Sequence, residues 1–165
     1  MIKTRPSERR GFALLIAVIF MSVMLAFGLA LGSLGYKQSV LASDALGSQY
    51  AFYVADGALE CVLYADQQLD LFAYTSNMAA PAPAMSCDGS GPISSTVTSH
   101  TLSRWVISER FSLDSGTHCA DVMVSKPAPG SGTTELFAQG YNVPCSIVTS
   151  SGGARFASRG LSAHY

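Results

Sequence analysis

Two carboxylates four residues apart, Asp56 and Glu60, are the first residues of this chain whose types and spacing could do chemistry. On a helix they would lie on one face. Such a pair could exchange protons with a substrate or supply oxygen ligands to calcium. Neither a nucleophile nor a histidine accompanies them. We therefore interpret them as helix carboxylates that face water or meet an arginine of a packed sheet.

Motifs for catalysis and for cofactors are missing from the sequence. It contains no phosphate-binding loop, no dinucleotide fingerprint, no zinc-protease helix and no nucleophile elbow. His100, His118 and His164 fall in different segments, and the basic residues form no patch for nucleic acid. We therefore expect no enzyme, no cofactor, no metal site, no small-molecule substrate and no nucleic-acid partner.

Four cysteines form the other reactive set: Cys61, Cys87, Cys119 and Cys145. No two of them have the C-x-x-C spacing of a zinc site. An even number of cysteines in an oxidising compartment predicts two disulfides. Cys61 and Cys87 would fix a loop to a helix, and Cys119–Cys145 is the second pair that we prefer. Four cysteines allow three connectivities, and the sequence does not choose among them.

The element that must carry these residues begins at the N-terminus. No charged residue lies between Arg10 and Lys37. As a helix, residues 11–36 would measure roughly 39 Å, enough to cross a hydrocarbon core of about 30 Å. Gly28 and Gly32 have the spacing that lets membrane helices approach closely, although glycine is also simply common in such helices. The sequence therefore predicts one membrane segment.

Charge predicts the orientation of this segment. Four basic residues and one acidic residue precede it, whereas six basic and ten acidic residues follow it. Positive charge keeps the N-terminus in the cytoplasm, so the remaining residues are expected outside. A cleaved secretory signal fits poorly, because its apolar core would be shorter and the best cleavage candidate, residues 40–42, lies beyond Lys37. A simple anchor explains length and charge equally well.

Beyond the membrane segment, helical spacing of apolar residues continues without a proline to about Tyr74. Proline and glycine then predict a connector, and from Thr101 the period changes to two. Strands are expected near residues 105–113, 119–125, 134–141 and 155–165. The expected fold class is α+β, with a long N-terminal helix packed on a C-terminal antiparallel sheet. The expected segments are a leader (1–11), a membrane half-helix (12–36), an outer half-helix (37–75), a connector (76–100) and a sheet region (101–165).

The junction of leader and helix, Arg9-Arg10-Gly11-Phe12, resembles the processing site of type IV prepilins. The resemblance implies cleavage between Gly11 and Phe12 by a prepilin peptidase, and N-methylation of Phe12. A second stretch, from Tyr53 to Glu60, is similar to PilX-like minor pilins and K-type pseudopilins. Gly140-Tyr141-Asn142, followed by Cys145, also resembles pilins. The expected fold is therefore pilin-like.

One position departs from the pattern of major pilins. They carry Glu at the fifth mature position, which is Ile16 here. The resemblance therefore implies a minor or tip-associated subunit of a type IV pilus or pseudopilus. Its partners would be other pilin subunits, the peptidase and the inner membrane, and its final location the pilus at the cell surface. The alternative is a single-pass anchored structural or adhesive domain that does not polymerise.

Overall fold

The N-terminal helix dominates the secondary structure. The computed structural model describes residues 10–89, 92–150, 153 and 155–165, with side chains from Phe12 onward. Helix α1 runs from Arg10 to Gln67, a length of 58 residues. The chain divides into two compact units, residues 1–43 and residues 44–165. The second half of α1 therefore belongs to the same unit as the sheet, while the apolar half belongs to the other.

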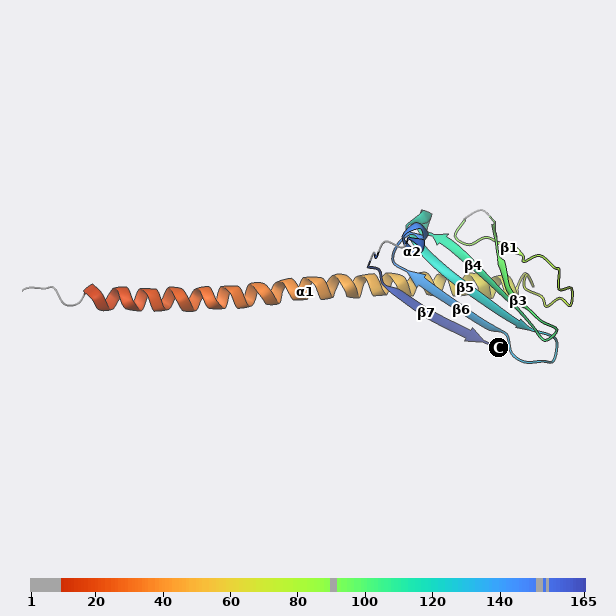
Figure 1. Ribbon diagram of the computed structural model, residues 1–165, viewed down its shortest axis with the longest axis horizontal. Helices are drawn as coiled ribbons and strands as arrows, with labels where there is room; N and C mark the ends of the chain where they lie inside the picture. Colours follow the sequence, from red (N-terminus) through yellow and green to blue (C-terminus); the bar gives the residue numbers. More distant parts are fainter. Residues whose placement is uncertain (1–9, 90–91, 151–152, 154) are drawn as a thin grey trace, which may run out of the picture. The chain divides into compact units, whose positions relative to one another are not determined.

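Five antiparallel strands form the main sheet of the second unit, in the order β3-β4-β5-β6-β7. Consecutive strands lie side by side, so the sheet is a simple meander (Figure 1). The strands are β3 (Thr96–His100), β4 (Arg104–Leu113), β5 (His118–Pro127), β6 (Glu135–Tyr141) and β7 (Ser158–His164). The short elements are β1 (Ala84–Met85), β2 (Ile93–Ser94), the 3-10 helix η1 (Asp114–Gly116) and α2 (Cys145–Thr149). The expected α+β class is confirmed.

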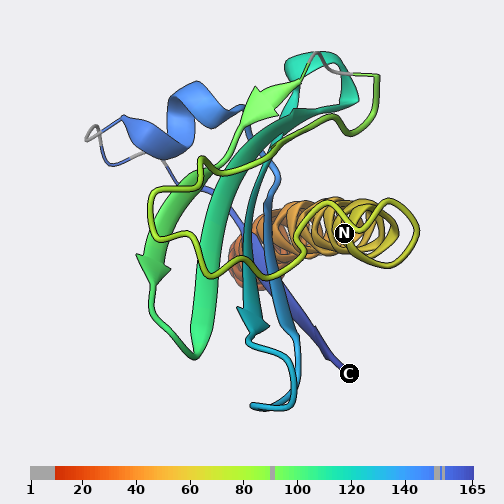
Figure 2. The same ribbon diagram turned by 90° about the vertical axis from the view of Figure 1, so that its right-hand side faces the viewer.

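The core lies between one face of this sheet and the outer half of α1 (Figure 2). Alternate residues of β4 point into it, as the period of two predicts. The helix contributes Ala51, Ala55 and Ala58, all fully buried. Their small side chains bring the helix backbone very close to the sheet at Gly140 of β6. A Cβ at Gly140 would lie only 3.0 Å from Ala55 Cα and closer still to two backbone atoms of α1.

The end of the helix corrects the expected half-helix 37–75. Helix α1 ends at Gln67, seven residues before Tyr74. Asp70 has a φ of 49°, in the left-handed region that interrupts a helix and that Asp tolerates better than most residues. The apolar residue Phe72, which the helical pattern had absorbed, instead turns back and is buried in the core. No glycine or proline marks this end, and the prediction therefore ran past it.

The expected connector 76–100 also needs correction, because β1, β2 and β3 lie within it. Strand β3 pairs with β4 at the edge of the sheet, and four of its five side chains are exposed. An edge strand with both faces in water has no apolar alternation to reveal it. The sheet therefore has five strands rather than the four expected. Its last strand is Ser158–His164 rather than 155–165, and the short helix α2 was not foreseen.

Candidate functional site

The apolar half of α1 has the chemistry of a segment that must be covered by something else. Every side chain from Phe12 to Tyr36 is exposed. In the described part of the chain, α1 is the helix long and apolar enough to cross a membrane. A soluble protein does not leave an apolar surface of this size in water. Lipid, or the apolar helices of other subunits, would provide that cover.

The polar side chains within this half are already satisfied. Ser22 donates its hydroxyl to the carbonyl oxygen of Ile19 at 2.8 Å, and Ser33 donates to that of Ala30 at 2.9 Å. Inside a membrane an unpaired hydroxyl would be costly, and these local bonds remove that cost. The segment therefore presents no unpaired polar side chain between Phe12 and Gly35.

Glycines give this half three positions without a side chain. A Cβ at Gly28, Gly32 or Gly35 would meet no other atom within 4 Å. Packing inside the described chain therefore does not require glycine at these positions. Their spacing would allow another helix to approach closely.

The expected processing site lies at the edge of what the structure describes. Residues 1–9 of the basic leader lie outside the described residues, and Gly11 is described only as backbone within α1. Phe12, the expected first mature residue, has 71% of its surface exposed. Ile16 is also exposed, and its position offers an apolar surface where major pilins would present a carboxylate.

Both disulfides belong to the second unit. Cys61 near the end of α1 pairs with Cys87 of the loop between β1 and β2, and Cys119 of β5 pairs with Cys145 of α2. These are the two pairs that the sequence analysis preferred. Each links residues 26 positions apart. They attach the β1–β2 region to the helix and α2 to the sheet.

The carboxylate pair of the helix is not built into a catalytic or metal site. Asp56 is half-buried and Glu60 is exposed. Among the residues described, neither forms an ion pair with an arginine of the sheet, and no group of three potential metal ligands occurs. Of the two environments considered, contact with water is the one that the structure shows.

The histidines remain apart and serve local contacts. His100 Nε2 donates to the carbonyl oxygen of Thr75 at 2.8 Å. His118 stacks on Tyr50 of α1, with 5.8 Å between ring centroids. Its Nδ1 lies 3.2 Å from Asp114 Oδ2. These contacts position loops against the helix and bring no nucleophile to either ring.

A buried ion pair, which the sequence analysis missed, fixes the end of α1 to the sheet. Lys126 of β5 lies 2.7 and 2.6 Å from the two carboxylate oxygens of Asp66, which is buried. The hydroxyl of Tyr165 also donates to Asp66. Burial, together with this bond to a carboxylate, raises the pKa of Tyr165. Sixty residues separate Asp66 from Lys126, so no spacing rule could have found the pair.

Glu109 is the second buried charge that the sequence could not interpret. It lies on the core face of β4 and is only 6% exposed. The hydroxyl of Ser95 donates to its Oε2 at 2.5 Å, while its Oε1 is buried without a partner among the described residues. Burial raises the pKa of Glu109 from 4.5 to about 7. The carboxyl group therefore has a structural effect that depends on pH, but no substrate-like cavity encloses it.

Comparison with known proteins adds no relative. No protein-family model, no curated protein and no solved structure matched this chain. The functional interpretation therefore rests on the residues and on the structure.

Proposed function

We propose that this chain is a structural subunit of a type IV pilus or a related pseudopilus, without enzymatic activity. The observation that carries the proposal is the division of one 58-residue helix. Its first half is apolar and exposed on all sides, while its second half is packed on an antiparallel sheet. This is the architecture that the prepilin-like junction at Gly11 and Phe12 implies.

The mechanism would be mechanical. Before assembly, residues 12–36 would cross the inner membrane, with the basic leader in the cytoplasm and the sheet unit outside. Cleavage after Gly11 would free the helix from its charged leader. The apolar half could then leave lipid and pack among the corresponding helices of other subunits. No catalytic group of this chain takes part in these steps.

Ile16 supports a minor or tip-associated subunit rather than a major one. A carboxylate inside a filament needs a cationic partner, because an unpaired buried charge is costly. Ile16 has no charge to pair and offers only apolar surface. It can therefore occupy a position in which a neighbouring N-terminal amine is absent.

The N-terminus of the membrane-extracted protein tests the proposal. We expect that mass spectrometry, with a prepilin peptidase coexpressed, finds a chain that starts at N-methylated Phe12. The variant Gly11→Ala should stay unprocessed. Gly28→Ala is the matched control and should be processed normally, because its Cβ meets no atom within 4 Å.

An intact Met1 in the presence of an active peptidase would exclude the pilin proposal. It would favour the second candidate, a single-pass anchored domain that does not polymerise. That candidate is supported by the same exposed apolar half, since length and composition alone do not distinguish an anchor from a prepilin helix.

A further inference from the structure

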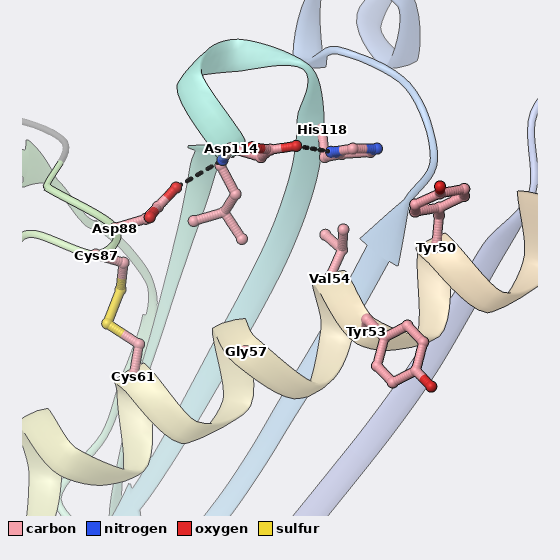
Figure 3. A pocket seen from close by; sticks show the side chains of 10 residues that line it. Tyr50, Tyr53, Val54, Gly57, Cys61, Cys87, Asp88, Asp114 and His118 are labelled. Atoms are coloured by element: carbon pink, nitrogen blue, oxygen red, sulfur yellow. Dashed lines mark hydrogen bonds and ion pairs between the residues drawn. A yellow bond between two sulfur atoms is a disulfide. The ribbon is translucent and has the colours of Figure 1, made fainter.

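A groove between the outer half of α1 and two loops has an apolar floor and an acidic rim (Figure 3). Its volume is about 420 Å³. Val54, Leu113 and the disulfide between Cys61 and Cys87 form apolar parts of its lining. Tyr50 and Tyr53 border it on the helix side, and both rings are more than half exposed. The groove is therefore shaped for a side chain that is apolar along its length.

The rim carries two carboxylates held in place by the loops. Asp88 Oδ2 accepts a hydrogen bond from the backbone N–H of Asp114 at 2.6 Å. Asp114 Oδ2 accepts one from the hydroxyl of Thr117 at 2.9 Å and lies 3.2 Å from His118 Nδ1. The Asp114 side chain is 74% exposed. A cationic group on a long aliphatic stem would fit this combination of carboxylates, aromatic rings and apolar floor.

One arginine of the same unit is left for such a contact. Arg104, Arg110 and Lys126 each form an ion pair with a carboxylate. Arg159 donates to the hydroxyl of Ser48 at 2.7 Å. Arg155 is exposed and forms no ion pair within the part of the chain that the structure describes.

The position of Arg155 suits a neighbouring copy. Arg159, four residues further on, is fixed beside Ser48, and Tyr50 at the groove follows Ser48 by two residues. At 1.5 Å per residue, Ser48 and Tyr50 are about 3 Å apart along the helix axis. The basic segment and the groove therefore lie at nearly the same level of α1. Two copies with parallel helices could bring them together after a small axial step.

We propose that the groove binds the Arg155 side chain of a second copy of this chain. This inference rests on the proposed function, because parallel helices in a filament create the necessary alignment. The contact is heterologous, since each copy offers its groove to one neighbour and its arginine to another. Such a contact extends into an open helical array. It favours a minor subunit that adjoins copies of itself over a single cap.

Photo-crosslinking in the full-length membrane protein tests the contact. The photoreactive residue p-benzoylphenylalanine replaces Tyr53, whose ring is 68% exposed at the groove. Unlabelled and isotope-labelled chains are mixed before irradiation, so that mass spectrometry separates adducts between copies from adducts within one chain. We expect an adduct between copies on the peptide that contains Arg155.

Charge variants identify the interaction. Arg155→Gln should lower the yield of the adduct about five-fold, the upper range for an exposed ion pair. Lys37→Gln is the matched control, because it also removes one exposed positive charge, and it should leave the yield unchanged. The double variant Asp88→Asn, Asp114→Asn should match Arg155→Gln and cause no further loss when combined with it. Asn suits both positions, where φ is 53° and 52°.

Salt gives an independent sign. Both copies carry net negative charge, so general repulsion would make their association stronger at high ionic strength, whereas an arginine–carboxylate contact becomes weaker. Adducts that avoid the Arg155 peptide, equal yields for Arg155→Gln and Lys37→Gln, or capture of a different protein would overturn the inference. The N-terminus measured in the same sample separates the two proposals. Loss of the contact in a chain starting at Phe12 would refute the groove inference alone, while an Arg155 adduct in a chain starting at Met1 would refute the pilin proposal alone.

Discussion

The close approach of α1 to the sheet at Gly140 gives the sharpest prediction for stability. In the variant Gly140→Ala, the new Cβ would lie 3.0 Å from Ala55 Cα, and closer to the carbonyl oxygen of Ala51 and the amide nitrogen of Ala55. An ordinary contact at this position is 3.4–4 Å. All three neighbours are backbone atoms of one helix and cannot rotate away. The helix must therefore shift from the sheet by several tenths of an ångström or more.

The shift disturbs a densely packed part of the core. Ala51 and Ala55 are fully buried, so any displacement there opens space beside the strands. Overpacking of this kind costs about 1–3 kcal/mol. Because rigid backbone opposes the new methyl group, we expect a loss near about 3 kcal/mol in the free energy of unfolding. For a unit of this size, that corresponds to a fall in Tm on the order of 10 °C.

Unfolding of the full-length protein in detergent micelles, followed by near-UV circular dichroism, measures this loss. Gly57→Ala is the matched control on the same helix, because its Cβ would meet no atom within 4 Å. It should stabilise the helix by up to about 1 kcal/mol through the higher helix propensity of alanine. A loss below about 0.5 kcal/mol for Gly140→Ala would show that helix and sheet are not in close contact, and the reasoning would fail.

Three further predictions follow from buried groups and crosslinks. Lys126→Met leaves the buried Asp66 without its cation and should cost about 3–5 kcal/mol in urea unfolding, whereas Lys126→Met with Asp66→Leu should recover most of that loss. Glu109 binds its proton more tightly in the folded state, where burial raises its pKa from 4.5 to about 7, so its contribution to stability is complete below pH 4.5 and lost as the pH rises to 7. The loss over this range should be on the order of 2 kcal/mol and disappear in Glu109→Gln. Replacing Cys119 and Cys145 by Ala should cost about 3 kcal/mol, and alkylation of the unreduced wild-type protein should label no cysteine.

The sequence predicts those parts of the fold that have a regular period. Trp105, Ile107 and Phe111 alternate because one face of β4 is buried, and the structure confirms the strand. Strand β3 has polar residues on both faces and thus no period to detect. The helix end at Gln67 depends on the left-handed Asp70 and on burial of Phe72, which are tertiary effects rather than local signals.

The candidate contacts follow the same division. Cysteines reveal themselves by type and number, and their preferred pairing agrees with the structure. The pair Asp66–Lys126 joins residues that only the fold brings together. Gly140 stands in a stretch that resembles pilins, but its steric reason, the backbone of α1 at Ala51 and Ala55, is visible only once helix and sheet are packed.

The exposed half of α1 limits what can drive assembly of a filament. In the described residues, the core of residues 44–165 takes no residue from 12–36, so this half can exchange one apolar cover for another without altering that core. Lipid tails are about as apolar as leucine side chains, and burial alone therefore gives little preference for a bundle over the membrane. The preference must come from close helix packing, which Gly28 and Gly32 permit, and from contacts outside the membrane. The groove and Arg155 supply such a contact, so a variant without Arg155 should still be processed and inserted but should associate more weakly.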